Sequence, residues 1–402
     1  MSEETPKKTV KKKVAKKSTR EVVPAVDDID IPEAASAVKD YDVVDAFGYD
    51  TAFNMALIGA GEAGGRIVST FYKLGYRRVA AINGGTELGQ LPAEIATLDL
   101  RTGGAGKDPQ TGAAQVADRD EEIFELMTRA FGKDPDYILV CVGLGGGTGG
   151  GVAPKLLDIA KKYMTERGKD PNRVGAIVTL PHHAEGYTPC RNAVTCFKQV
   201  ADKKPSPLLI IDNLRIGELA PDDKKGFRKL YHYANEQVAK LFHLFNRFAA
   251  TRSEILTFDR ADFASLLDSG ICVFGASPIP TFDSPADISQ AIREQLATTV
   301  LAQVDLRRGQ KAGCLFVGPP EILDAVPVDF FDGGFSMLTR ILSEGSVVHR
   351  GIYEGSRPDL RCFTMLAGLP APSERLKKLA SEGGLTGDSG AAGFLGVDDG
   401  VD

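Results

Sequence analysis

GLGGGTGGGVAP, residues 143–154, stands between an apolar run typical of a buried strand, YILVCVG at 137–143, and a stretch with helical periodicity at 152–166. Glycine accepts positive φ and lets a backbone approach a ligand closely, so a glycine-rich junction can turn successive N–H groups into one concavity. The first turn of the following helix adds unpaired N–H donors and a partial positive charge. Thr148 supplies a hydroxyl group within the loop. The stretch therefore predicts an anion site that needs no lysine.

Two further glycine-rich loops have the same setting. GAGEAGG at 59–65 follows the strand-like run MALIGA, and GGAGKDPQTG at 103–112 precedes another helical stretch. Any one of these loops is compatible with a tight turn, but three loops at the ends of successive strands favour a phosphate site at the open edge of a sheet. The chain has no GxxxxGKS/T motif, which argues against an ordinary P-loop enzyme. A nicotinamide-dependent dehydrogenase is an alternative, although the chain shows no His or Lys constellation for its chemistry.

Short apolar runs alternate with amphipathic stretches from residue 53 onward. Strands are expected at 55–60, 78–83, 137–143, 174–180 and 208–212, with helices at 64–74, 112–131 and 152–166 between them. This succession predicts an α/β fold with a Rossmann-like, mostly parallel sheet covered on both faces. A long central helix is expected over 222–250, where apolar residues recur at three- and four-residue steps. Beyond it, strands at 271–277, 314–318, 346–354 and 361–369 and helices near 285–302 and 333–343 predict a smaller α/β unit.

Four segments are therefore expected along the chain. They are a flexible basic N-terminal tail (1–48), a nucleotide-binding domain that includes the central helix (49–250), a smaller C-terminal domain (251–372) and a flexible C-terminal tail (373–402).

Composition favours a soluble globular protein. The 402 residues are 43% hydrophobic and 25% charged with a formal net charge of −6, and no apolar run is long enough to span a membrane or to form a signal peptide. We therefore expect a cytoplasmic protein without a transmembrane segment. The six cysteines form no CxxC pair, so neither zinc nor a disulfide framework is indicated. The Lys-rich run at 7–17 predicts a solvated arm, or less often a contact for DNA, an anionic lipid or an acidic tail.

The motifs together resemble the tubulin/FtsZ superfamily, and FtsZ-like prokaryotic proteins most. GLGGGTGGGVAP resembles the phosphate signature of that family, GAGKDPQTG resembles its γ-phosphate loop, and IGAGEAGGRIV followed by AIN resembles its first two strands. The resemblance runs from about residue 53 to 370. It implies GTP or GDP as ligand, with Mg²⁺ bridging the phosphates and no side chain assigned as a metal ligand. The implied nucleotide contacts are Gly59, Gly61, Glu62, Ala63, Gly64, Asn83, Gly104, Ala105, Gly106, Gly145, Gly146, Gly147, Thr148 and Gly149.

Two residues of the expected central helix are candidates for recognising the guanine base. Tyr231 and Asn235 are four residues apart and so share a face, where a ring can stack on a base and an amide can both donate and accept. The family uses such a pair. Its further base or ribose contact matches Asn213, and its Glu and Arg near the ribose and phosphates match Glu185 and Arg191, which here lie two residues further apart.

TFDRADF, residues 257–263, carries the candidate catalytic acids Asp259 and Asp262. In the family a similar DxxD loop reaches the nucleotide of the next subunit and polarises the attacking water. An alignment on DFA would leave one acid too few, so Asp259 with Asp262 is preferred, with Thr257 standing where the family usually has Asn. Two solvated loop acids are the plainer interpretation.

These residues predict a GTPase that polymerises head-to-tail, each active site being completed by its neighbour, in cell division or cell shape. A nucleotide-dependent scaffold without turnover and a DNA-segregation filament are the alternatives. The C-terminal end, GFLGVDDGVD, is a candidate adaptor-binding segment.

Overall fold

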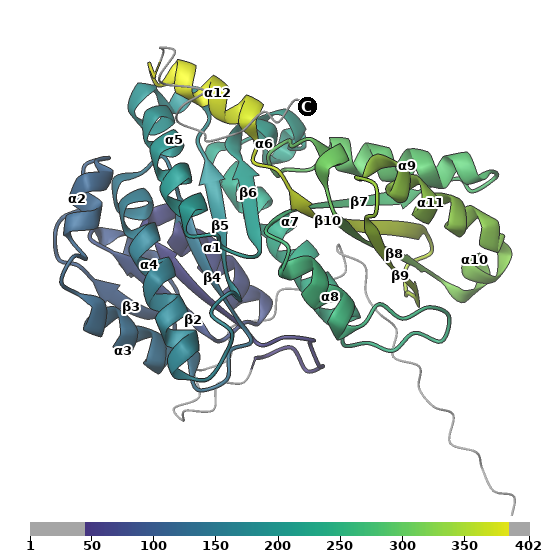
Figure 1. The fold of residues 1–402 in the computed structure, drawn as a ribbon, viewed down its shortest axis with the longest axis horizontal. Helices are drawn as coiled ribbons and strands as arrows, with labels where there is room; N and C mark the ends of the chain where they lie inside the picture. The colour runs from purple at the N-terminus through teal and green to yellow at the C-terminus, as the bar shows by residue number, and fades with distance from the viewer. Residues whose placement is uncertain (1–44, 386–402) are drawn as a thin grey trace, which may run out of the picture.

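Ten strands form one continuous sheet in the computed structural model, which describes residues 45–385 (Figure 1). Their order is β3-β2-β1-β4-β5-β6-β7-β10-β8-β9. Neighbours from β3 to β7 pair in parallel, β10 is antiparallel to both β7 and β8, and β9 is parallel to β8. The predicted α/β class with a mostly parallel sheet is confirmed.

The strands are β1 (Met55–Ala60), β2 (Val79–Asn83), β3 (Ala96–Asp99), β4 (Tyr137–Gly143), β5 (Val174–Leu180), β6 (Leu208–Asp212), β7 (Ile271–Ile279), β8 (Lys311–Gly318), β9 (Val347–Glu354) and β10 (Leu360–Leu369). The α-helices are α1 (Gly61–Leu74), α2 (Pro109–Ala114), α3 (Asp120–Phe131), α4 (Gly147–Glu166), α5 (Tyr187–Asp202), α6 (Asn213–Leu219), α7 (Phe227–Phe248), α8 (Arg260–Leu267), α9 (Pro285–Ala297), α10 (Pro320–Ala325), α11 (Val328–Ile341) and α12 (Ser373–Glu382). Short 3-10 helices occupy Thr86–Gln90 (η2), His183–Glu185 (η3), Asp222–Lys224 (η4) and Leu306–Arg308 (η5).

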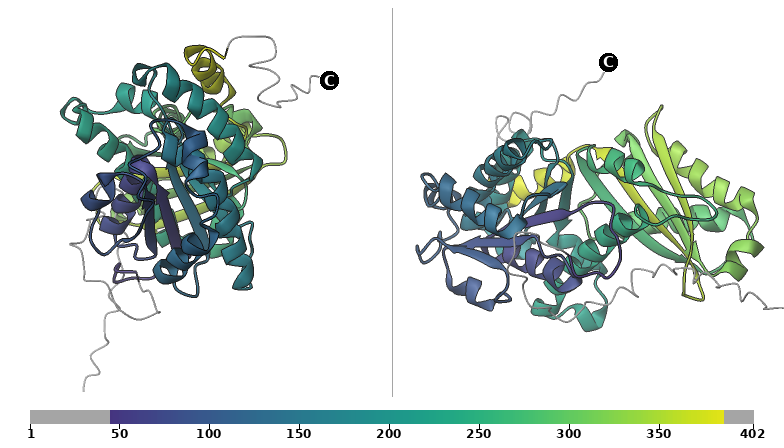
Figure 2. Two further views of the ribbon diagram at one scale, coloured as in Figure 1. Left: turned by 90° about the vertical axis from the view of Figure 1, so that its left-hand side faces the viewer. Right: turned by 90° about the horizontal axis from the view of Figure 1, so that it is seen from below.

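Helices cover both faces of the parallel part of the sheet (Figure 2). Met55 and Leu57 of β1 belong to the core beneath α1 and α7, whereas Ala56 and Ile58 belong to the core beneath α3, α4 and α5. A strand buried on both faces carries no polar alternation, because neither face meets water. This is why the central strands read as unbroken apolar runs in the sequence.

The long helix α7 connects the two halves. Its 22 residues span about 33 Å at 1.5 Å per residue. Val238 and Phe242 are buried in the core under β1, and Phe245 packs against Phe258 and Phe274 of the second half. The helix therefore packs against both halves within one continuous core. The sheet is also continuous across the two halves, since Leu208 and Leu209 of β6 pair with β7.

Helices α1 and α4 begin inside the glycine runs rather than after them, three and five residues earlier than expected. The expected helix at 112–131 is instead two helices, α2 and α3. Close packing explains the glycines: a Cβ on Gly112 would lie 2.3 Å from the Gly147 carbonyl oxygen, and one on Gly151 would lie 2.1 Å from the Pro109 carbonyl oxygen. Glycine here permits two helix backbones to touch.

The C-terminal tail begins later than expected, because residues 373–382 form α12 and pack on α5. Leu376 and Leu379 are fully buried. Arg375, only 7% exposed, donates to both Asp212 carboxylate oxygens at 3.0 and 2.8 Å and to the Pro181 carbonyl oxygen at 2.6 Å. An apolar stripe and a buried ion pair therefore hold a segment that the sequence analysis expected to be flexible.

The N-terminal tail also ends earlier than expected. Asp45 pairs with Arg78 at 3.4 Å, and the Phe47 ring meets the Tyr76 ring at 4.8 Å between centroids. The Lys-rich arm and the GFLGVDDGVD segment lie outside the described residues. Between residues 45 and 385 no helix is long and apolar enough to cross a membrane.

Candidate functional site

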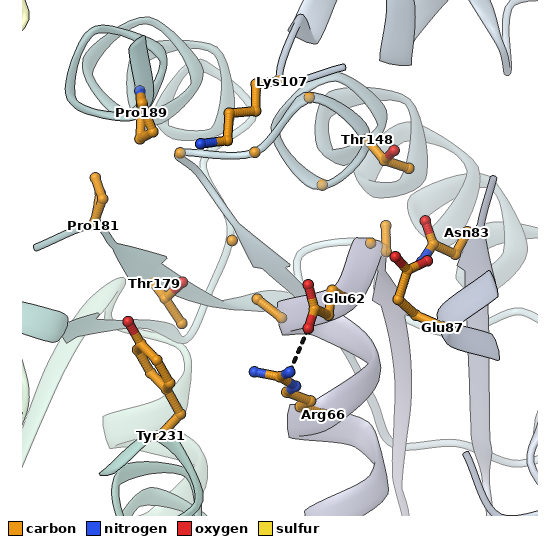
Figure 3. A pocket seen from close by; sticks show the side chains of 18 of the residues that line it. Glu62, Arg66, Asn83, Glu87, Lys107, Thr148, Thr179, Pro181, Pro189 and Tyr231 are labelled. Atoms are coloured by element: carbon orange, nitrogen blue, oxygen red, sulfur yellow. Dashed lines mark hydrogen bonds and ion pairs between the residues drawn. The ribbon is translucent and has the colours of Figure 1, made fainter. Parts of the chain in front are cut away.

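A cavity of about 460 Å³ opens at the carboxyl ends of five parallel strands (Figure 3). Its walls include a residue at the end of each strand, namely Ala60, Asn83, Gly143, Thr179 and Ile211. The predicted edge of the sheet thus carries a formed cavity.

The first turn of α4 makes one wall of the cavity. Gly146 is its N-cap and has no side-chain cap, so the N–H groups at Gly147, Thr148 and Gly149 begin the helix beside the open space. Gly61 has φ of +70°, and a Cβ there would lie 3.1 Å from the Gly149 nitrogen. The two loops therefore touch through backbone alone and leave a cradle lined by N–H groups, which suits an anion.

The 103–112 loop closes the cradle. The Asp108 carboxylate accepts from the Thr111 hydroxyl at 2.6 Å and from the Gln110 N–H at 3.0 Å, and these bonds lower the pKa of that carboxyl from its usual value. Asn192, which is 9% exposed on α5, donates from Nδ2 to the Lys107 carbonyl at 2.7 Å and to the Gly145 carbonyl at 3.2 Å. One amide thus ties two glycine loops together.

The opposite end of the cavity carries the aromatic and amide pair. Tyr231 and Asn235 line it from α7. Tyr231 lies across from Glu62 and Arg66 of α1, which form an ion pair (Figure 3). Burial raises the pKa of Tyr231, the Glu185 carboxylate adds to the rise, and the Arg66 charge opposes it. The Tyr231 ring, the Glu185 carboxylate and the Arg66 guanidinium therefore all line the same cavity.

Glu185 and Asn213 lie side by side in the wall. Glu185 Oε1 accepts from the His182 N–H at 2.8 Å and from Asn213 Nδ2 at 3.1 Å. Asp212 caps α6 by accepting from the Leu214 N–H at 3.1 Å, and this cap fixes the turn that presents Asn213.

Most of the residues expected at a nucleotide line this cavity: Gly61, Glu62, Ala63, Asn83, Gly104, Ala105, Gly145, Gly146, Gly147, Thr148, Gly149, Glu185, Asn213, Tyr231 and Asn235. Gly59, Gly64, Gly106 and Arg191 do not line it. A Cβ on Gly64 would lie 2.1 Å from the Cys141 carbonyl oxygen, so Gly64 serves helix-to-strand packing. Arg191 is exposed on α5, beside the end of α12.

Several wall residues escaped the sequence analysis, among them Arg66, Glu87, Lys107, Thr179, Pro181 and Pro189. Glu87 Oε2 accepts from Asn83 Nδ2 at 3.0 Å, so the loop after β2 brings a carboxylate to the cavity. The sequence signal for Glu87 was its position four residues after Asn83, an expected nucleotide contact. Asn192 gave none, because only the tertiary fold brings α5 under both loops.

Asp259 and Asp262 stand at the start of α8, away from the cavity. Arg260 between them pairs with Asp136 at 3.1 Å, and Asp136 accepts from the Asn54 N–H at 2.8 Å. Asn54 and Asp136 immediately precede β1 and β4, so the two acids lie at the amino ends of strands whose carboxyl ends form the cavity. Within one chain these acids and the cavity are at opposite edges of the sheet.

Residues 94–221 match the model of the Tubulin/FtsZ family, GTPase domain. The cell division protein FtsZ 2 of Pyrococcus furiosus is 26% identical over 301 residues, which cover 72% of this chain and 70% of that protein. The tubulin-like protein TubZ of Bacillus cereus is 26% identical over 172 residues, 41% of this chain and 38% of that protein.

Two solved structures show the same fold. The GTPγS-form protofilament of Bacillus thuringiensis serovar israelensis TubZ has a TM-score of 0.72 at 18% identity, covering 83% of this chain and 92% of that one. The GTPγS-bound protofilament of Haloferax volcanii CetZ2 has a TM-score of 0.66 at 22% identity, covering 82% and 97%.

Proposed function

The chain is assigned to the tubulin/FtsZ superfamily of GTP-binding, filament-forming proteins, and from this premise we propose that it binds GTP in the cavity and hydrolyses it within head-to-tail filaments. The observation that carries the proposal is the placement of the cavity and of the DxxD acids at opposite edges of one parallel sheet.

The phosphates would lie on the glycine cradle. Three loops supply backbone N–H groups there, and Cβ atoms at Gly61 or Gly147 would crowd neighbouring backbone, at 3.1 Å from the Gly149 nitrogen and 2.7 Å from the Asp108 nitrogen. Lys107 adds a positive charge at the same wall. These residues fit a polyphosphate, because donors and a cation face one space.

Mg²⁺ is part of the proposal because phosphoryl transfer spreads charge that a divalent cation neutralises. It generally keeps several waters and takes one or two carboxylates. Among residues 45–385, three carboxylates line the cavity. Glu62 forms an ion pair with Arg66, and Glu185 accepts hydrogen bonds from Asn213 and from the His182 N–H. Glu87 accepts one hydrogen bond, from the side-chain amide of Asn83. Glu87 is therefore the carboxylate we assign to the hydrated cation.

The base would lie at the α7 end. Tyr231 offers a ring for stacking, and Asn235 can donate to the guanine carbonyl and accept from its ring N–H. Glu185 and Asn213 would meet the ribose or the base edge from the segments that follow β5 and β6, with Gly59 and Gly64 supporting the first loop from outside the cavity.

The acids of the next subunit would complete the site. Asp259 and Asp262 are too remote from the cavity of their own chain, but stacking one subunit's carboxyl-end edge on another's amino-end edge brings cavity and acids together. Such a contact joins two different surfaces, so it repeats into an open filament. The carboxylates would orient and polarise the water that attacks the terminal phosphate.

The cellular role proposed is a cytoplasmic filament in division or cell shape, as the FtsZ relatives are named cell division proteins. DNA segregation is a second candidate, because a structural neighbour is a plasmid-segregation TubZ. A scaffold without turnover is favoured by Thr257, whose hydroxyl is engaged with the Ser253 backbone. We further propose that the C-terminal segment GFLGVDDGVD binds an adaptor and that the Lys-rich arm binds an anionic partner.

Mixing two defective variants tests the shared site. Asp259→Ala should bind GTP without hydrolysing it, and Asn235→Ala should bind GTP weakly but still present intact acids. Each alone should release little phosphate, whereas the mixture should regain turnover together with pelleting, with GTP and not with ATP. Asp283→Ala, an exposed acid in the same half of the chain, serves as the control. A mixture that stays inactive while both variants are folded and Asp259→Ala binds GTP would contradict a site shared between subunits.

A further inference from the structure

His349 of β9 is bonded to one of the proposed catalytic acids. Its Nδ1 lies 2.7 Å from Asp262 Oδ1, with the two side chains 15% and 27% exposed. An ionised carboxylate only accepts, so the hydrogen at this contact belongs to Nδ1 and His349 is the donor. The bond therefore assigns the imidazole orientation relative to Asp262.

The other Asp262 oxygen is held by the start of α8. Oδ2 accepts from the Asp259 N–H at 3.0 Å, while Asp259 Oδ1 accepts from the Ala261 and Asp262 N–H groups at 2.8 and 3.0 Å. This reciprocal cap and the His349 bond together fix the Asp262 carboxylate plane at both oxygens. Each oxygen keeps a further lone pair, so the carboxylate can still accept from a water molecule.

Strand β9 supports the whole DxxD segment. Four residues along the strand, the Tyr353 hydroxyl donates to the Phe258 carbonyl at 3.0 Å and accepts from the Phe258 N–H at 2.8 Å. The Ile352 N–H donates to the Leu256 carbonyl at 2.9 Å. The backbone before Asp259 is thus anchored without His349, so the imidazole contributes something other than loop placement.

His349 Nε2 is buried and has no hydrogen-bond partner among residues 45–385. A buried polar atom without a partner costs about 1–3 kcal/mol, so a residue retained for stability alone would be better replaced by an apolar side chain. The feature that such a replacement would lose is the Nδ1 donor to Asp262.

We propose that His349 is a positioning residue for hydrolysis: it holds the Asp262 carboxylate so that its remaining lone pairs face the neighbouring subunit's nucleotide. The inference rests on the proposed function, since Asp262 acts only where a second subunit docks. It extends the inter-subunit site to β9, in a part of the chain that the sequence analysis gave no catalytic role.

Two substitutions separate positioning from packing. His349→Leu fills the space without a donor, and His349→Asn places an amide N–H near the Nδ1 position. The leucine variant should bind GTP and pellet like the wild type, yet its turnover per polymerised subunit should fall by about 10- to 100-fold, as when a supporting bond to a functional ligand is removed. The asparagine variant should recover most of that loss.

Arg350→Gln is the matched control, because Arg350 is the next residue on the strand and points away from His349, toward Asp332 and the Phe335 ring. Its turnover should stay at the wild-type level. Adding His349→Leu to Asp262→Ala should lower turnover no further than Asp262→Ala alone.

Wild-type turnover in His349→Leu, with Asp262→Ala inactive, would overturn the positioning role and leave the proposed function intact. Equal losses of polymer and thermal stability in the leucine and asparagine variants would assign His349 to structure alone and also overturn it. Full turnover in both Asp259→Ala and Asp262→Ala would instead reject the proposed function itself.

Discussion

His243 is a fully buried imidazole on α7 that lies between two phenols. Its Nε2 is 2.6 Å from the Tyr49 hydroxyl and its Nδ1 is 3.1 Å from the Tyr76 hydroxyl. Burial, together with the Arg247 charge, lowers the pKa of His243 to about 3. The neutral ring can donate from one nitrogen and accept at the other, which satisfies both phenols.

This residue should make stability sensitive to mild acid. The unfolded chain takes up a proton on His243 below about pH 6.5, whereas the folded chain does so only near the lower value, so stability is lost as pH falls between the two. The loss is at most about 1.4 kcal/mol per pH unit. His243→Gln should be less stable than the wild type at pH 7 but should lose less on acidification. Urea unfolding at several pH values from 4.5 to 7.5 measures this.

His232→Gln is the control for this measurement, because His232 is half-exposed and pairs with Glu236 at 3.3 Å. It should follow the wild-type pH dependence. Parallel curves for His243→Gln and the wild type would show that the buried imidazole does not carry the acid sensitivity.

Among the elements, the contact between α2 and α4 depends on missing side chains. Gly151→Ala would place a methyl group 2.1 Å from the Pro109 carbonyl oxygen, so one helix must move. Because the first turn of α4 lines the cavity, we expect GTP affinity to fall at least tenfold, as judged by titration with a fluorescent analogue, a loss of about 1.4 kcal/mol.

Gly217→Ala is the matched control within α6, where the nearest atom to a new methyl group lies 3.9 Å away. It should keep its affinity and gain up to about 1 kcal/mol of stability from better helix propensity. Unchanged affinity in Gly151→Ala would mean that the loop tolerates the displacement.

Burial decides which strands and helices could be predicted from the sequence. MALIGA and YILVCVG became β1 and β4 with the expected bounds, because burial on both faces leaves an unmistakable apolar run. Strand β3 was missed, since the short sequence ATLD lies at the sheet edge with every residue partly exposed. Helix α12 was missed because its Leu376 and Leu379 stripe is short and adjoins a glycine-rich end.

The candidate site also contains residues that the sequence predicted and residues that it did not. Glycine loops and the Tyr231–Asn235 spacing are local signals, and these residues do line one cavity. Asn192 supports it only through bonds to the distant Lys107 and Gly145 carbonyls, which no local pattern encodes.

On the scale of the whole molecule, the Arg375–Asp212 pair connects the last helix to the cavity. Both side chains are buried, at 7% and 3% exposure, and the Pro181 carbonyl that Arg375 also binds belongs to a wall residue. Arg375→Met should lower the free energy of unfolding by about 3–5 kcal/mol, because it leaves Asp212 charged and unpaired in the interior.

Thermal unfolding and GTP titration check this, with Lys377→Met as the control. Lys377 lies on the same helix, pairs with Glu374 at 3.1 Å and is 53% exposed, so its loss should change stability by well under about 1 kcal/mol. If Arg375→Met and Lys377→Met have the same thermal stability and the same GTP affinity, the Arg375–Asp212 pair does not support the cavity.

That pair also imposes an order on biosynthesis. Asp212 leaves the ribosome well before Arg375. During synthesis the Asp212 carboxylate therefore lacks its ion-pair partner until the last helix has been made. Although the sequence reads as two successive domains, the last helix packs on the first of them and pairs with its Asp212. A nascent chain released before α12 should carry an incomplete pocket, and the wall formed by β5 and β6 should close only once the final helix has emerged.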